Sequence, residues 1–176
     1  HLLLLRIWQQ LVQRLGAESP RLLIIGQRGW EAEAVFRILD GDASLRGHVE
    51  ELNGCSDGEV AHHLGSATAL LFPSLAEGYG LPLIEALGAR LPVIASDLPV
   101  FREIAGDIPD YLDPSDEPAW ESAIIDYAQA GRGARAAQIK RIVQFSMADW
   151  ADHFPLGEQW LATIPAPAAG DRAASR

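Results

Sequence analysis

The feature that most constrains the fold is a regular alternation of short apolar runs with longer segments of helical periodicity. The runs at residues 21–25, 46–52, 69–72 and 92–95 predict β-strands, and Tyr111–Leu112 predicts an edge strand. Between them, residues 30–40, 57–63, 81 onward and 99–105 predict helices. Strands that alternate with helices favour an α/β fold, in which helices cover both faces of a parallel sheet.

Helical segments also begin and end the chain. Leu4, Trp8, Leu11 and Leu15 fall on one helical face, and Gly16 is a typical residue just past a helix end. Residues 119–130, 134–145 and 147–164 predict a helical C-terminal segment. The Pro- and Ala-rich stretch after it predicts a flexible tail. We therefore expect one domain over residues 1–164 and a tail over residues 165–176.

Charge and cysteine content restrict the classes of partner. The formal net charge of −10 argues against nonspecific nucleic-acid binding, which needs a basic surface. The single cysteine, Cys55, allows no disulfide within the chain and favours a reducing compartment. No apolar run approaches the ~20 residues of a membrane span. These features predict a cytoplasmic location.

The stretch from Phe72 to Glu85 carries the most chemical information. A strand is followed by a loop with Gly78 and Gly80, and then by a helix with proline in its first turn. Such a loop places backbone N–H groups around an anion, at the carboxyl end of a strand where α/β sheets bind ligands. Glu77 and Glu85 bracket the loop, and carboxylates accept hydrogen bonds from sugar hydroxyls. On spacing alone, Glu85 could equally interact with the helix dipole, and Glu77 could be solvated.

The residues from Phe72 to Ala86 closely resemble the signature, with its two glutamates, of retaining glycosyltransferases of the two-domain GT-B fold. This branch includes bacterial mannosyl- and glucosyltransferases of surface-polysaccharide assembly. The resemblance continues in register over roughly residues 1–150, through Gly26–Trp30, Leu52–Val60, Pro92–Asp97 and Phe101–Asp107. It implies a Rossmann-like domain, the donor-binding C-terminal half of such an enzyme.

The resemblance also implies a role for each matching residue. Glu77, as the catalytic residue, would contact donor-sugar hydroxyls near the reacting carbon, and Glu85 would hold the nucleoside ribose. The remaining donor-binding residues would present backbone to the sugar and diphosphate (Gly78, Tyr79, Gly80, Leu81), frame the base (Asn53, Gly54, Cys55), or lie near the phosphates (Gly26, Arg28). For Arg28, a plain surface arginine is an equally good interpretation.

The implied reaction moves a hexosyl group, with mannosyl favoured, from a GDP- or UDP-linked sugar to an acceptor hydroxyl with retention. It implies no metal and no other cofactor. Family members carry a strand and a loop with a basic residue just before the helix that opens this chain, and an acceptor-binding N-terminal domain. We expect both to be missing here, so that the isolated chain transfers no sugar. Any peripheral association with the membrane would run through that missing half.

Two alternatives remain open at this point. One is a sugar-nucleotide epimerase or phosphorylase of the same fold, and the other is a nonenzymatic nucleotide-binding domain. Several residues are assigned structural roles: the five tryptophans are expected to anchor the core. His62 and His63 are expected on a solvated face rather than at a metal, and Asp57 is expected to cap its helix.

Overall fold

The computed structural model describes residues 1–30, 32–129, 133–146 and 150–164. The chain divides into two compact units, His1–Phe145 and Ser146–Arg176. The second contains helix α8 (Trp150–Ala162), whose Trp160 and Leu161 are exposed and add no apolar area to a core. The predicted tail, 165–176, lies outside the described residues.

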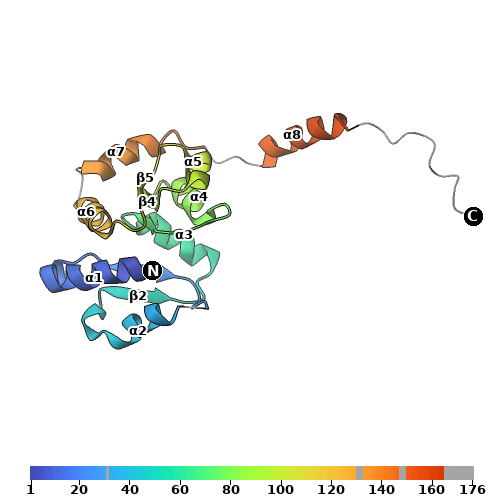
Figure 1. Cartoon of the computed structure of the whole chain (residues 1–176). Coiled ribbons are helices and arrows are strands. Elements are labelled where there is room, and N and C mark those ends of the chain that lie inside the picture. Colours follow the sequence, from blue (N-terminus) through green and yellow to red (C-terminus); the bar gives the residue numbers. More distant parts are fainter. Residues whose placement is uncertain (31, 130–132, 147–149, 165–176) are drawn as a thin grey trace, which may run out of the picture. The chain divides into compact units, whose positions relative to one another are not determined.

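Helices and strands alternate along the first unit as the sequence predicts (Figure 1). Each predicted strand is present within a few residues of its expected bounds. The order is α1 (Leu2–Leu15), η1 (Gly16–Glu18), β1 (Leu22–Ile25), α2 (Glu33–Gly41), η2 (Ala43–Leu45), β2 (Val49–Leu52), α3 (Asp57–Ser66), β3 (Leu70–Phe72), α4 (Leu81–Gly88), β4 (Val93–Ser96), α5 (Pro99–Ala105), β5 (Asp110–Leu112), α6 (Glu117–Ala128) and α7 (Gly133–Ile142).

All strand pairs are parallel, which confirms the predicted fold class. The strands form two sheets, however, rather than the single sheet that the sequence suggested. One has the order β1-β2 and the other β3-β4-β5. In the described part of the chain, no strand pairing joins the two sheets.

Strand β4 shows that helices cover both faces of the three-stranded sheet. Val93 and Ala95 are fully buried in a cluster with residues of α4, α5 and α7, whereas Ile94 is fully buried in a second cluster with residues of α1 and α6. Successive side chains of a strand point to opposite faces, so each face has its own core. The α4 core comprises Leu83, Ala86, Leu87, Leu91, Val93, Ala95, Phe101, Ala105 and Ile142.

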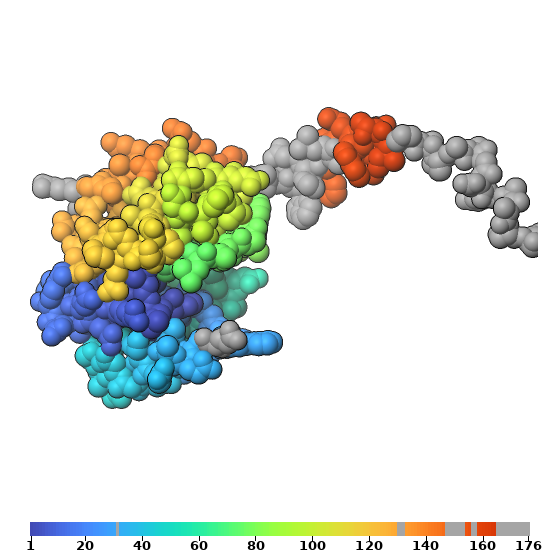
Figure 2. Space-filling view, viewed as in Figure 1, coloured from blue at the N-terminus to red at the C-terminus, as the bar shows by residue number. Residues whose placement is uncertain are grey.

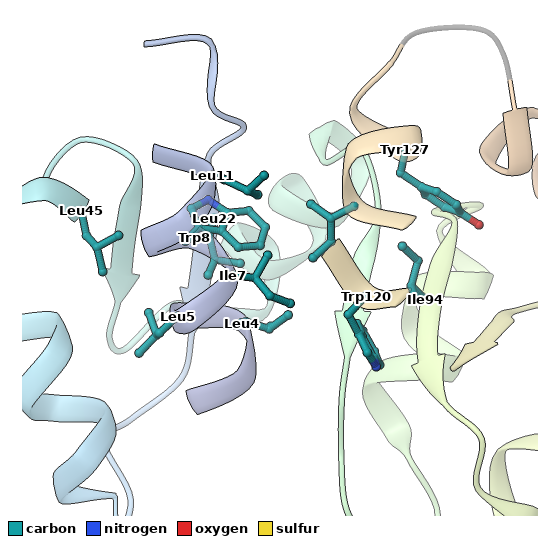
Figure 3. Close-up of a cluster of buried hydrophobic side chains, with 11 residues drawn as sticks. Leu4, Leu5, Ile7, Trp8, Leu11, Leu22, Leu45, Ile94, Trp120 and Tyr127 are labelled. Carbon is teal, nitrogen blue, oxygen red and sulfur yellow. The ribbon is translucent and has the colours of Figure 1, made fainter. Parts of the chain in front are cut away.

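The second cluster, the α1 core, joins the two sheets. It comprises Leu4, Leu5, Ile7, Trp8, Leu11, Leu22, Leu45, Ile94, Trp120, Ile124 and Tyr127, which Figure 3 draws as sticks. Residues of α1, dark blue in Figure 2, lie between those of α2 and those of α6. Because Leu22 belongs to β1 and Ile94 to β4, helix α1 holds together two sheets that share no strand pairing.

The tryptophans divide into two groups. Trp8 and Trp120 anchor the α1 core as expected, and each indole N–H donates to a backbone carbonyl, of Pro20 at 2.8 Å and of Asp113 at 2.9 Å. The expectation was wrong for Trp30, which is 97% exposed, and for Trp160. Trp30 follows the glycine loop after β1, before α2 begins, so no helical or strand periodicity turns its side chain inward. The Trp150 side chain lies outside the described part of the structure.

A buried amide completes the start of β4. Gln138 of α7 is fully buried; its Oε1 accepts from the Val93 N–H at 2.6 Å, and its Nε2 donates to the Val93 carbonyl at 2.7 Å. Pairing of β4 with β5 begins one residue later, at Ile94↔Asp110. On the side of β4 that faces β5, the side-chain amide therefore takes the place of a strand partner for Val93.

Helix α3 is capped by Ser56, not by Asp57. The Ser56 Oγ accepts from the Glu59 N–H, and the Glu59 carboxylate accepts from the Ser56 N–H at 2.8 Å, which is a capping box. Asp57 is the first helical residue, one position beyond the cap.

Among the described residues, no helix combines the length and the apolar character that crossing a bilayer requires.

Candidate functional site

The loop between β3 and α4 has the geometry of an anion site. Gly80, the N-cap of α4, has φ 96° and ψ 52°, in the left-handed region that favours glycine. Its carbonyl accepts from the Leu83 N–H at 3.1 Å, so the helix begins directly after the turn. Residues 75–79 are exposed, and the first N–H groups of a helix have no partner within it. The positive end of the α4 dipole therefore lies beside an exposed loop at the carboxyl end of β3.

Both glutamates of the predicted motif are exposed beside this loop. Glu77 lies within it, and Glu85 lies in α4, little more than one turn past the cap. The Ser74 hydroxyl donates to Glu77 Oε1 at 2.8 Å and so restrains its carboxylate. Ser74 was not among the predicted site residues. The three-residue spacing of a serine before a glutamate could have indicated this contact.

Two further loops meet at the carboxyl end of the β1-β2 sheet. Gly26 follows β1 with φ 146° and donates its N–H to the Leu52 carbonyl at 3.1 Å. Asn53 and Gly54 follow β2 and are exposed, while Cys55 is half-buried with a free thiol. The structure thus brings Gly26 together with the segment that the resemblance assigns to the base.

Arg28 is exposed, but its guanidinium is paired with two carboxylates. Its guanidinium donates to both Asp40 oxygens at 2.9 and 2.7 Å and to both carboxylate oxygens of Glu51, and it lies 4.8 Å from the centre of the Phe36 ring. The hydrogen bonds to Asp40, and then those to Glu51, raise the pKa of Arg28, while Arg28 lowers the pKa of Asp40. A phosphate would have to compete with two carboxylates for this cation.

A second arginine network lies at the carboxyl end of β4. Arg102 of α5 donates to both carboxylate oxygens of Asp97 at 2.6 and 3.0 Å and lies 4.5 Å from the centre of the Tyr111 ring. This pairing lowers the pKa of Asp97. The Tyr111 hydroxyl in turn donates toward the carbonyls of Phe101 and Gly106. Together these contacts tie α5 to the ends of β4 and β5.

The predicted site residues thus form two groups. Glu77, Gly78, Tyr79, Gly80, Leu81 and Glu85 belong to one strand–loop–helix unit after β3. Gly26, Arg28, Asn53, Gly54 and Cys55 lie at the end of the β1-β2 sheet. Within the described ranges, no three His, Cys, Asp or Glu side chains are grouped as a metal site would require.

Comparisons with known proteins agree with this architecture. The family model described as "Glycosyl transferases group 1" matches residues 1–129. One relative, the O-antigen chain mannosyltransferase RfbU of Salmonella typhimurium, is 41% identical over 117 residues, which are 66% of this chain and 33% of the relative. The O-antigen chain mannosyltransferase B of Escherichia coli is 26% identical over 84% of this chain and 38% of its own length. The chain spans about a third of the length of these relatives.

Solved structures show the same fold. WaaG, a glycosyltransferase involved in lipopolysaccharide biosynthesis, superposes with a TM-score of 0.66 at 19% identity, over 92% of this chain and 42% of WaaG. The pneumococcal O-GlcNAc transferase GtfA, solved with UDP and GlcNAc, gives a TM-score of 0.64 at 19% identity, over 92% of this chain and 32% of GtfA. With the family model matching most of its length, this chain belongs to the group 1 glycosyltransferases.

Proposed function

We propose that this chain is the donor-binding part of a retaining hexosyltransferase that uses a nucleoside-diphosphate sugar. The observation that carries the proposal is the turn at Gly80, which opens α4 beside an exposed loop and between two exposed glutamates. Family membership supplies the reaction class. The loop geometry supplies a place for a diphosphate with hydroxyl-binding carboxylates on either side.

Each part of the loop has a role in the proposed chemistry. Backbone groups of Gly78, Tyr79, Gly80 and Leu81 face the sugar and diphosphate. The α4 N-terminus stabilises the negative charge that develops on the departing diphosphate. Glu85 accepts hydrogen bonds from the ribose. Glu77, restrained by Ser74, accepts hydrogen bonds from the donor sugar near the reacting carbon.

We propose GDP-mannose as the donor and surface-polysaccharide synthesis as the setting. The support is that both relatives described above are named O-antigen chain mannosyltransferases. The reaction needs no metal in this proposal, because a helix dipole and basic groups stabilise the diphosphate. The single free cysteine favours the cytoplasm, where the enzyme would meet the membrane through a part that this chain lacks.

The proposed enzyme is longer than this chain. The two relatives are about twice its length, and its strands form two sheets that are not paired with each other. We propose that an upstream strand pairs with one edge of each sheet and is followed by a basic loop at the diphosphate. We also propose that a separate domain binds the acceptor. The 176-residue chain alone then transfers no sugar.

Turnover by a longer protein that contains this chain tests the proposal. With GDP-mannose, Glu77→Gln should lower kcat by about a hundredfold or more, because contacts near developing charge carry much of the barrier reduction. Glu85→Gln should chiefly raise KM. Glu103→Gln, an exposed glutamate on α5, serves as the matched control and should change neither.

The alternatives give different results in the same assay. An epimerase would change the hexose without transferring it, and a phosphorylase would depend on inorganic phosphate. A protein that binds the nucleotide sugar but never consumes it would be a nonenzymatic binder. Any of these outcomes would contradict the proposed transferase.

A further inference from the structure

Gly80 is held against an aromatic ring with no room for a side chain. A Cβ at this position would lie 2.6 Å from Cε1 and 3.1 Å from Cδ1 of Phe101. The backbone φ of 96° independently disfavours any other residue. Both the positive φ and the lack of space beside Phe101 therefore favour glycine at the residue that precedes α4.

The Phe101 ring cannot easily yield. It is fully buried in the α4 core and stacks on Phe72 of β3, with ring centres 5.1 Å apart and planes inclined by 26°. Its backbone is also restrained, since its carbonyl accepts from the Tyr111 hydroxyl at 3.0 Å. Its neighbour Arg102 is paired with Asp97. The ring is thus a fixed wall behind the turn.

We propose that Phe101 is a positioning residue for donor binding, whose buried ring fixes the turn at Gly80 and so presets the exposed loop and the first turn of α4. Phe101 itself touches no donor in this scheme; it acts through Gly80. The proposal rests on the proposed function only for its ligand, a nucleoside diphosphate.

A loop that is already ordered binds more tightly, because its backbone entropy is not lost on binding. Residues 75–79 are exposed and have little packing of their own. The contact of Gly80 with Phe101 fixes the end of this loop that joins α4. Loss of the ring should therefore loosen residues 78–81 more than the rest of the domain.

A double-mutant cycle on the 176-residue chain tests the contact without any ligand. Gly80→Ala should lower the folding equilibrium constant. In the Phe101→Leu background the clashing ring edge is absent, and the factor by which Gly80→Ala lowers this constant should be about tenfold smaller than in the parent chain. Ile142→Val, which trims another buried residue of the α4 core on α7, should leave the Gly80→Ala effect unchanged. Additive effects of Gly80→Ala and Phe101→Leu would overturn the proposal.

Backbone ¹⁵N relaxation and nucleotide affinity separate positioning from simple stability. Phe101→Leu should raise the mobility of residues 78–81 and weaken GDP binding by about fivefold or more, while Ile142→Val changes affinity less than about twofold. An ordered loop or an unchanged affinity in Phe101→Leu would refute the positioning role. If GDP, UDP and ADP bind neither to the parent chain nor to a chain with the upstream segment restored, the proposed function fails. The cycle and the relaxation data then decide on their own whether Phe101 fixes the loop.

Discussion

Replacement of the buried amide of Gln138 should destabilise the first unit strongly, although Gln138 lies in no predicted site. In Gln138→Leu, the Val93 N–H and carbonyl lose both partners in a fully buried position. Leucine is similar in size but offers neither a donor nor an acceptor. The cost therefore arises from two unsatisfied backbone groups rather than from a cavity.

The expected magnitude follows from those two groups. A buried polar group without a partner costs about 1–3 kcal/mol, so the pair costs roughly 2–6 kcal/mol. The greater apolar character of leucine offsets about 1–2 kcal/mol. The free energy of unfolding should then fall by about 1–4 kcal/mol, which corresponds to a decrease in Tm of roughly 3–12 °C for a unit of this size.

Urea unfolding, followed by fluorescence of the buried Trp8 and Trp120, measures this change. Gln144→Leu, the same substitution at an exposed position after α7, is the matched control and should change stability by less than about 0.5 kcal/mol. An equally small effect of Gln138→Leu would contradict this prediction, because it would mean that the Val93 N–H and carbonyl had found other partners.

Three further predictions concern the helix cap, alkaline pH and the isolated chain. Ser56→Ala should lower the free energy of unfolding by about 1 kcal/mol in urea titrations, and more than Asp57→Ala does, because Ser56 holds the capping box; the reverse order would contradict this. Burial raises the pKa of Tyr111 to about 12 from the ordinary 10.0. The native phenol therefore keeps its proton longer than the unfolded chain, and stability should fall as pH rises from 10 toward 12. Ultraviolet absorbance should show an ionisation step near pH 12 that is absent in Tyr111→Phe. If the step remains in this variant, another group causes it and the prediction is wrong. The 176-residue chain should transfer no hexose from GDP-mannose in a radiolabel assay, and measurable turnover would refute the proposed need for an acceptor domain.

The strand–helix alternation was predictable from sequence because its signals are local. β4 reads as a continuous apolar run preceded by Pro92, and it is buried on both faces. The Gly78–Pro82 segment carries turn and helix-start residues at the positions where the structure uses them. The loop between β3 and α4 could be located for the same reason.

Features set by distant contacts were not predictable in this way. The stack of Phe101 on Phe72 and its contact with Gly80 join segments far apart in the chain. The surroundings of Arg28 are similar: Asp40 and Glu51 belong to different elements, and nothing in the spacing reveals that they neutralise it. The division into two sheets depends on which strand edges meet, and apolar patterning does not encode that.

Nucleotide binding by this chain tests the central claim most directly. We would titrate GDP, UDP and ADP in turn, without and with Mg²⁺, and follow the backbone amide shifts. We expect one nucleotide, with GDP favoured, to bind without metal and to shift the amide signals of residues 78–81 and 83–85. Binding that perturbs other residues and leaves these amides unmoved would contradict this expectation. So would an absence of binding that persists after the upstream segment is restored.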